Sequence, residues 1–263
     1  MRLPFVAAIA LILLSLDGAC ATGQASPAIE KPTIVLVHGA FAESASWDGV
    51  TSRLIRAGYP VIAAANPLRS ASGDAAYISS IVDSIHGPVV LVGHSYGGTV
   101  ISAAANGHGN VTALVFVSAF APDSGETSFG LAGLYPGATL SAALAPPVHL
   151  ANGDNDLYID QSKFRAQFAA DVPVAQAALM GATQRPINAA AGSEPAPAPA
   201  WRAIPSYFIY GSADLNIPPA AQAFMAARAH SRHTVEVRGA SHVVMISHPR
   251  EVTALIEEAA SRN

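Results

Sequence analysis

Cysteine is almost absent from this chain, which contains a single one, Cys20, in 263 residues. One cysteine cannot form a disulfide within the chain, so a packed apolar core must hold the fold together. Charged residues are also scarce, at 12%, and the net charge is −4 with no basic run. Because nucleic-acid-binding domains cluster Lys and Arg, we expect no nucleic-acid partner.

Long apolar runs are equally rare, and the one candidate covers Leu3 to Leu16 near the N-terminus. This run is shorter than the roughly 20 residues that a membrane-spanning helix needs. A basic residue, Arg2, precedes the run, and the small residues Ala19 and Ala21 follow it, as in a cleaved export signal. We therefore expect residues 1–21 to be a signal peptide and the mature protein to be periplasmic or secreted.

A second interpretation of the same boundary makes Cys20 the acylated first residue of a lipoprotein. Asp17 argues against this interpretation, because it occupies a position that normally carries an apolar residue. Unless the chain is lipid-anchored at Cys20, we expect no membrane partner. Residues 22–31 form a polar, proline-containing lead-in that we expect to be flexible.

Apolar runs of strand length alternate with helix-like patterns over much of the remaining chain, in which apolar residues are plentiful (51% of the sequence). The run at 33–37 is typical of a strand buried on both faces in a parallel sheet. The alternation predicts an α/β fold with a mostly parallel sheet and helices on both faces. We expect strands at 33–37, 61–65, 89–92, 111–120, 206–210 and 234–238.

The helical patterns indicate which side chains face the core. One helix ends at Gly58 and is expected to bury Trp47, Val50, Leu54 and Ile55. Asp74 is expected to cap the next helix, whose inward residues are Ile78, Ile81, Val82 and Ile85. Two later helices are expected at 218–229 and 249–260.

Residues 121–201 break this alternation. The stretch contains scattered aromatic residues, helix-like pieces around 160–182 and a proline-rich linker at 193–199. A structureless loop of about eighty residues is improbable between two core strands. We therefore expect an inserted cap over 121–201.

The stretch Gly93-His-Ser-Tyr-Gly97 follows a buried strand and precedes a helix-compatible run. This G-x-S-x-G pattern is typical of a sharp strand-to-helix turn that exposes a serine hydroxyl. Small residues suit the positions around the serine, because the turn crowds the backbone. Ser95 is therefore the candidate nucleophile, and the Tyr96 N–H is a candidate donor to a developing oxyanion.

A serine hydroxyl needs a neighbouring base, which is itself oriented by a carboxylate. Asp214 and His242 each lie just beyond the end of an expected strand, where catalytic groups of such sheets gather. The chain order Ser95, Asp214, His242 is the order expected of a triad on this topology. Asp123, which also follows a strand, is the rival acid.

The other eight histidines suit other tasks. His38 and His94 also stand at strand ends, where structural hydrogen bonding fits them better than proton transfer. No pair of histidines or carboxylates shows metal-ligand spacing, so we expect neither a metal nor another cofactor.

A second oxyanion donor is expected from the loop after the first strand. Ala40 is the preferred donor, because a small residue lets the backbone approach the substrate closely, and the Phe41 N–H is the alternative. The Phe41 side chain is assigned to the substrate pocket wall, with plain core packing as the other interpretation.

Several motifs together resemble the α/β-hydrolase superfamily: His38-Gly-Ala-Phe41, Gly93-His-Ser-Tyr-Gly-Gly98, Gly211-Ser-Ala-Asp214 and Ser241-His242. Ala119-Phe-Ala-Pro-Asp123 and Ala182-Thr-Gln-Arg-Pro186 resemble a bacterial small-esterase branch related to pyrethroid hydrolases and to plant salicylate-ester esterases and hydroxynitrile lyases. The resemblance implies one α/β-hydrolase domain over 32–263. The short region before Thr33 leaves little room for two leading strands, so about six are expected.

The resemblance implies Ser95 as nucleophile, His242 as base, Asp214 as orienting acid, and Ala40 and Tyr96 as oxyanion donors. The expected activity is hydrolysis of small to medium carboxylic esters through an acyl-enzyme. Two alternatives remain: a hydroxynitrile-lyase-like or perhydrolase reaction on the same triad, and a ligand-binding protein of negligible turnover. The sequence does not indicate the oligomeric state.

Overall fold

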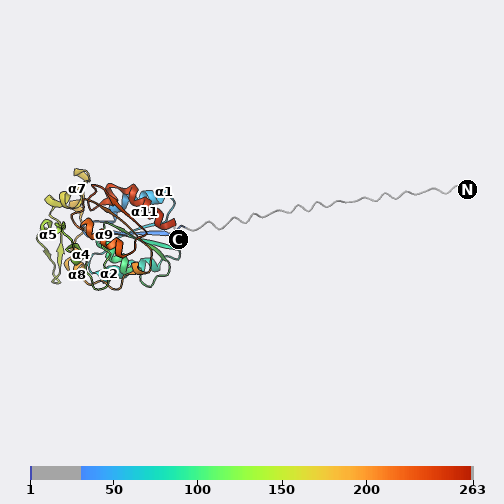
Figure 1. The fold of residues 1–263 in the computed structure, drawn as a ribbon, viewed down its shortest axis with the longest axis horizontal. Coiled ribbons are helices and arrows are strands. Elements are labelled where there is room, and N and C mark those ends of the chain that lie inside the picture. Colours follow the sequence, from blue (N-terminus) through green and yellow to red (C-terminus); the bar gives the residue numbers. More distant parts are fainter. Residues whose placement is uncertain (2–30, 262–263) are drawn as a thin grey trace. The chain divides into compact units, whose positions relative to one another are not determined.

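Six strands form one parallel sheet at the centre of the computed structural model, which describes Met1 and residues 31–261 (Figure 1). Neighbouring strands pair in the order β2-β1-β3-β4-β8-β9, and every pair is parallel. The predicted α/β fold with about six core strands is confirmed. The strands are β1 (Thr33–Val37), β2 (Val61–Ala64), β3 (Val89–His94), β4 (Val111–Val117), β8 (Ser206–Gly211) and β9 (His233–Val237).

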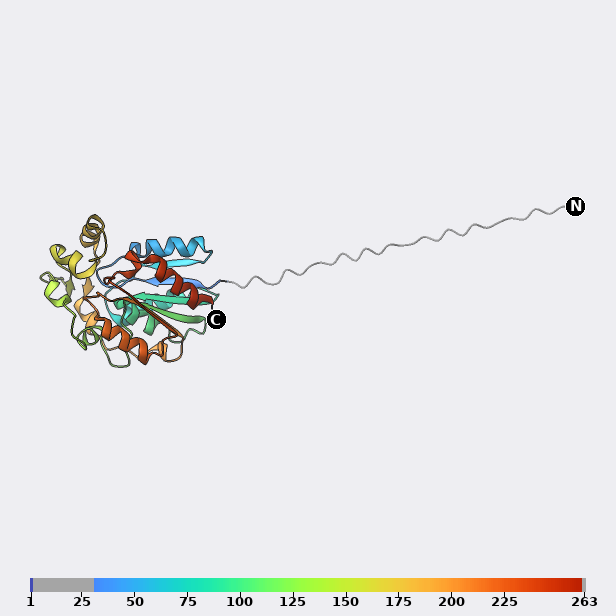
Figure 2. The ribbon, with the colours of Figure 1, turned by 45° about the horizontal axis from the view of Figure 1, so that its top comes forward.

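The central strands owe their stability to burial on both faces. All six residues of β3 and all six of β8 are buried, in contrast to the partly exposed edge strands β2 and β9. Helices cover both faces of the sheet (Figure 2). Helices α1 (Asp48–Arg56) and α11 (Pro249–Ser261) pack together, and α2 (Ala71–Asp83) packs against α3 (Tyr96–Ala104), which also contacts β1, β3 and β4. Helix α9 (Pro219–Arg228) packs on β8.

Two details of the helix predictions are wrong. Ile55 is 58% exposed, whereas Trp47, Val50 and Leu54 are fully buried. Successive helical residues are rotated by about 100°, which carries Ile55 out of the stripe that Val50 and Leu54 share. The cap of α2 is Ser70, whose side chain accepts from the Gly73 N–H, and Asp74 lies inside the first turn.

The segment between β4 and β8 builds a separate group of elements beyond the carboxyl ends of the strands (yellow-green to orange in Figure 2). It contains a small antiparallel sheet, β5 (Val148–His149), β6 (Asn155–Leu157) and β7 (Ile187–Asn188). Its helices are α4 (Ser128–Ala132), α5 (Leu140–Ala143), α6 (Gln161–Phe168), α7 (Val174–Thr183), α8 (Ala189–Ser193) and the 3-10 turn η2 (Ala200–Arg202). We call this group the cap.

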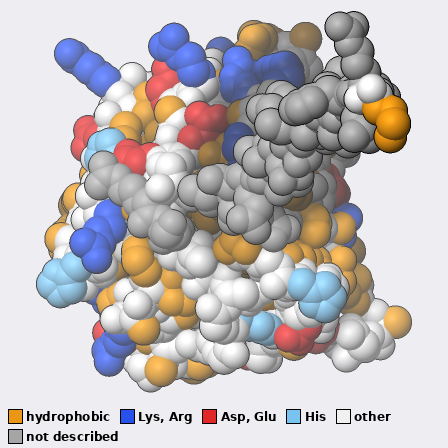
Figure 3. All heavy atoms as spheres, turned by 90° about the vertical axis from the view of Figure 1, so that its right-hand side faces the viewer, with side chains coloured by type: hydrophobic (Ala, Val, Ile, Leu, Met, Phe, Trp, Pro, Cys, Tyr) orange, Lys and Arg blue, Asp and Glu red, His pale blue; other side chains and the backbone are white. Residues whose placement is uncertain are grey.

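Two short elements complete the fold near the carboxyl ends of the core strands: η1 (Ser44–Trp47) and α10 (Val244–Ser247). Within residues 31–261, no helix has both the length and the apolar character needed to cross a membrane. Apart from Met1, the predicted signal peptide, with Cys20, lies outside the described residues, and so does the predicted lead-in except Lys31. On the face drawn in Figure 3, acidic and basic side chains are interspersed with apolar and neutral ones.

Candidate active site

Ser95 stands at the sharp turn between β3 and α3, with backbone angles φ 53° and ψ −123°. A positive φ in a residue other than glycine costs on the order of 1–3 kcal/mol and persists only where surrounding contacts hold it. Here the Ser95 N–H donates to the Ser118 carbonyl at 3.1 Å, and the Ser95 carbonyl accepts from the Phe120 N–H at 3.1 Å. The segment that follows β4 thus holds the turn.

The glycines beside Ser95 are required by close backbone packing. A Cβ added at Gly93 would lie 2.6 Å from the Gly97 carbonyl oxygen, and one added at Gly97 would clash with the Val37 carbonyl oxygen. Real Cβ atoms do not approach backbone atoms so closely, so only glycine fits at either position. The predicted crowding around Ser95 is confirmed.

Asp214 and His242 come from the ends of neighbouring strands, β8 and β9, and meet in a direct hydrogen bond. His242 Nδ1 lies 2.8 Å from Asp214 Oδ2, and both side chains are almost fully buried. Since the carboxylate accepts from Nδ1–H, Nε2 is the nitrogen left to act as a base. The structure therefore brings together the predicted acid and base, and His242 and Ser95 line the same cavity.

Asp214 receives three further hydrogen bonds. Its Oδ1 accepts from the backbone N–H groups of Asn216 at 2.8 Å and Ile217 at 3.0 Å, and its Oδ2 accepts from Gln222 Nε2 at 2.9 Å. With the bond to His242, each carboxylate oxygen of Asp214 accepts two hydrogen bonds. This arrangement keeps Asp214 oriented toward His242 although its side chain is shielded from water.

Gln222→Leu is expected to lower kcat about tenfold with little change in KM. The substitution removes one of the two donors to Asp214 Oδ2 and leaves the bond to His242 in place. A lost hydrogen bond to a charged group is worth about 1.5–3 kcal/mol, part of which appears in the barrier. Steady-state kinetics at several pH values test this. Unchanged kcat across the pH range would show that Gln222 only packs α9 against the core.

Two aromatic rings, those of His94 and Phe168, pack against the imidazole of His242. The ring centroids of His94 and Phe168 lie 4.8 Å and 5.0 Å from that of His242. His94 Nε2 is 3.2 Å from the His242 carbonyl oxygen, so this nitrogen carries the proton and donates. Burial lowers the pKa of His94 well below its usual value, so that the ring stays neutral.

His38 shapes the loop that follows β1. Its Nδ1 lies 2.9 Å from the Gly39 carbonyl, and its Nε2 accepts from the Asn66 N–H at 3.1 Å. These partners assign the proton to Nδ1. Burial lowers the pKa of His38, which preserves the acceptor role of Nε2. His38 and His94 thus have the structural hydrogen-bonding roles expected of them.

The free energy of unfolding is expected to fall as the pH drops below about 6.5, the ordinary pKa of histidine. His38 and His94 have folded-state pKa values below that of the unfolded chain, so the unfolded state takes up protons first. Stability from these groups is complete above 6.5 and is lost between 6.5 and the folded-state pKa. Denaturant unfolding at pH 7.5 and 5.5 measures the loss, and His94→Leu should reduce it. An equal loss in both proteins would contradict the assignment to His94.

The two predicted oxyanion donors both reach the cavity beside Ser95. Ala40 and Tyr96 line it, and neither N–H donates to a protein acceptor in the described part of the chain. The Phe41 N–H, the alternative donor, is already bonded to the Arg185 carbonyl at 2.9 Å. The free donors are therefore those of Ala40 and Tyr96.

The backbone around these donors is tied to the cap. Phe41 has φ 60°, and so does Leu68 in the next loop of the core. Phe41 donates to Arg185, and Leu68 accepts from the Asn188 N–H at 3.0 Å. The short cap segment 185–188 therefore holds both strained residues.

Asp74 explains the orientation of the Tyr96 side chain. The Tyr96 hydroxyl donates to Asp74 Oδ2 at 2.8 Å inside the core. Burial raises the pKa of both groups, and the nearby Asp74 carboxylate raises that of Tyr96 further. This bond fixes the first residue of α3, whose N–H is one of the two candidate oxyanion donors.

The rival acid Asp123 lies elsewhere. Both of its oxygens accept from Arg202 Nη2 at 2.7 Å, and this ion pair lowers the pKa of Asp123. Asp123 is not a neighbour of the cavity that contains Ser95 and His242. Among residues 31–261, no group of three or more His, Cys, Asp or Glu side chains could hold a metal ion.

The cavity at Ser95 is small, at about 40 Å³, and lies between the core and the cap. Phe41 lines it and packs edge-on against Phe168 with ring centroids 6.1 Å apart. The cap contributes Ser128, Phe129, Ala132, Leu140, Phe168, Ile187 and Gly192.

Comparison with known proteins agrees with this geometry. The model of the alpha/beta hydrolase family matches residues 34–255, which is most of the chain. This chain belongs to the alpha/beta hydrolase family. The hydrolase is 27% identical to the alpha/beta hydrolase nvfD of Aspergillus novofumigatus (strain IBT 16806) over 88% of its own length and 97% of that protein's.

Two solved structures show the same fold. Polyneuridine aldehyde esterase has a TM-score of 0.76 at 20% identity, and the match covers 87% of this hydrolase and 99% of that chain. A pyrethroid hydrolase from Sphingobium faniae JZ-2 has a TM-score of 0.68 at 23% identity, covering 88% and 98%. The resemblance to the esterase branch inferred from the motifs is confirmed.

Sequence reasoning missed Gln222, Asn216 and Phe168 in this hydrolase. Gln222 stands on a helix whose sequence pattern indicates only a buried face. Phe168 lies in the cap, where the pattern does not reveal which aromatic residues face the core. The Asp-x-Asn spacing at 214–216 is the one local signal available, because Asp side chains commonly accept from backbone groups two residues ahead.

Proposed function

We propose that this hydrolase cleaves carboxylic esters of short, unsubstituted acyl groups through an acyl-enzyme on Ser95. The observation that carries the proposal is the 2.8 Å bond between His242 Nδ1 and Asp214, next to a cavity that Ser95 and His242 share. The esterase named among the solved structures supports the same reaction class.

The proposed reaction has two halves. The Ser95 oxygen attacks the ester carbonyl carbon, and His242 Nε2 takes the hydroxyl proton. The oxyanion accepts from the Ala40 and Tyr96 N–H groups; His242 then gives its proton to the alcohol oxygen as the C–O bond breaks. Water attacks the acyl-enzyme with His242 again as base, and the acid leaves as Ser95 regains its proton.

Cavity size and polarity support a short, plain acyl group. Apart from Ser95, Tyr96 and His242, the wall has two polar side chains, and both are bonded to protein: Ser128 Oγ lies 2.9 Å from Thr99 Oγ1, and Asn216 Nδ2 donates to the Gln167 carbonyl at 3.0 Å. These bonds use part of the hydrogen-bonding capacity of both side chains, so an acyl group with a hydroxyl or carboxylate would find few partners there. Much of its desolvation cost would therefore go uncompensated.

Hydrolysis of a p-nitrophenyl ester series from acetate to decanoate tests the proposal. We expect the highest kcat/KM at two to four acyl carbons and at least a tenfold decrease by octanoate. A serine-directed phosphonate should label Ser95 and stop turnover. Labelling without turnover of any ester would favour a ligand-binding protein, and aldehyde or peracid among the products would favour the lyase or perhydrolase alternative.

A further inference from the structure

One residue of the cavity at Ser95 also belongs to the molecular surface. Phe129 of α4 lines the cavity, and 40% of the residue is exposed to solvent. The other lining residues are buried, except Ala132 and Leu140, which are half-buried. Phe129 is therefore the most exposed part of the wall between the cavity and solvent.

The ring of Phe129 rests on Gly192 of helix α8, which lines the same cavity. A Cβ added at Gly192 would clash with Cζ of Phe129 and would lie 2.6 Å from its Cε2. The backbone of Gly192 is not left-handed, and within a helix alanine is favoured over glycine. The backbone therefore does not require a glycine at this position, whereas the contact with the ring does.

The backbone that carries Phe129 is anchored on both sides of this residue. Ser128 Oγ lies 2.9 Å from Thr99 Oγ1 of the core. Thr127 caps α4, because its side chain accepts from the Gly130 N–H at 3.0 Å. Exposed side chains change rotamer within nanoseconds, so the Phe129 ring can swing toward solvent while α4 stays in place.

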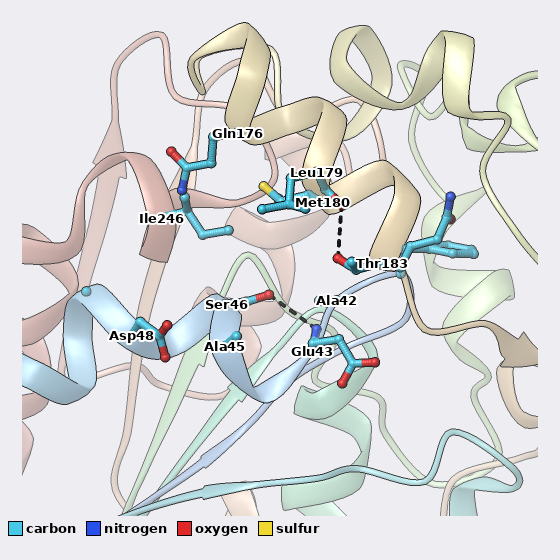
Figure 4. A pocket seen from close by; sticks show the side chains of 13 residues that line it. Ala42, Glu43, Ala45, Ser46, Asp48, Gln176, Leu179, Met180, Thr183 and Ile246 are labelled. Atoms are coloured by element: carbon cyan, nitrogen blue, oxygen red, sulfur yellow. Dashed lines mark hydrogen bonds between the residues drawn. The ribbon is translucent and has the colours of Figure 1, made fainter.

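Phe41 closes the cavity in a second direction, and it is held more firmly. It also lines a hollow of about 310 Å³ between α7 and the η1–α1 segment, which is drawn in Figure 4. Phe41 is buried, its N–H is bonded to the Arg185 carbonyl, and its ring packs against Phe168. Extending the cavity past Phe41 would disturb this buried packing, whereas extending it past Phe129 leads to solvent.

We propose that Phe129 limits the length of the acyl group, and that Gly192 positions its ring for this role. The inference rests on the proposed function, in which a short acyl group occupies the cavity. A longer acyl chain needs space that about 40 Å³ does not provide. Because solvent lies beyond Phe129, a smaller side chain there would let the acyl chain continue to the surface.

The p-nitrophenyl ester series from acetate to decanoate tests the proposal with two variants. We expect Phe129→Ala to raise kcat/KM for the octanoate ester at least tenfold, the scale on which apolar pockets discriminate chain length. The rate with acetate should stay within threefold of the wild type, which also shows that the variant is folded. Tyr77→Ala is the matched control, since Tyr77 is 42% exposed on α2 and does not line the cavity. Its chain-length profile should equal that of the wild type.

Gly192→Ala tests how the ring is positioned. The added methyl group should displace the ring toward solvent, so we expect kcat/KM for the octanoate ester to rise about fivefold. In a Phe129→Ala background the same substitution should have no effect, because no ring remains to be displaced. An equal effect in both backgrounds would show that Gly192 acts through α8 alone and would overturn its assigned role.

The outcomes separate this inference from the proposed function. An unchanged chain-length profile in Phe129→Ala, with short esters still hydrolysed by the wild type, would overturn the inference alone. Absence of hydrolysis of every ester in the series by the wild type would overturn the proposed function as well.

Discussion

Ser95→Ala is expected to lower kcat for p-nitrophenyl acetate by on the order of 10⁶-fold, the size of effect found when a serine nucleophile is removed from a complete triad. Of the other hydroxyl groups at the cavity, that of Tyr96 donates to Asp74 and that of Ser128 is paired with Thr99. KM is expected to change little, because the cavity walls and both oxyanion donors remain. Endpoint assays with long incubation times measure the residual rate.

Ser102→Ala is the matched control for this variant. Ser102 is a buried serine on α3 whose hydroxyl forms no hydrogen bond within the described residues. Its removal is expected to leave kcat within twofold and to leave stability nearly unchanged, because no bond is lost. If Ser95→Ala retained more than a thousandth of the wild-type rate in a folded protein, Ser95 would not be the nucleophile.

Asp214→Asn is expected to lower kcat about 10⁴-fold at neutral pH. The backbone N–H groups of Asn216 and Ile217 both donate to Oδ1, so the amide oxygen of an asparagine must take that place. Its NH2 group then faces His242 Nδ1, which can pair with it only as an acceptor. The single ring proton therefore moves to Nε2, and the neutral imidazole can no longer accept the Ser95 proton.

The pH profile separates this tautomer effect from a loss of folding. Deprotonation of Ser95 by hydroxide does not need His242, so part of the lost rate should return at high pH. Asp123→Asn is the control, because that carboxylate pairs with Arg202 away from the cavity. We expect its kcat to stay within twofold of the wild type. A large loss in Asp123→Asn and a small one in Asp214→Asn would reverse the assignment of the acid.

The sheet and the positions of the candidate catalytic residues could be predicted because local sequence rules determine them. A continuous run of Val and Leu specifies a strand buried on both faces, and the glycines around Ser95 specify a sharp turn. Asp214 and His242 were found from their distance to a strand end, which parallel topology converts into proximity. Each inference needed only a few adjacent residues.

Other features depend on residues that are far apart in the sequence. The sequence pattern favours Asp74 as the N-terminal residue that caps α2, whereas Ser70 does so in the structure. Asp74 instead lies in the core, where its carboxylate accepts from the Tyr96 hydroxyl. The bond from Gln222 to Asp214 and the pairing of Phe41 with Arg185 likewise join separate elements. The size of the cavity depends on how the cap packs on the core. The spacing of apolar residues in the sequence does not predict this packing.

The ties from segment 185–188 to Phe41 and Leu68 bear on how such an enzyme can change over evolution. Both are bonds between main-chain atoms, so they impose no requirement on which side chains the cap carries. Substitutions in the cap can therefore redraw substrate preference while the oxyanion loop keeps its geometry. Relatives that share about a quarter of their residues can therefore keep the same arrangement of the reacting groups and differ in substrate specificity. Selection for new substrates then acts on side chains of the cap, and the backbone of the loop after β1 is preserved.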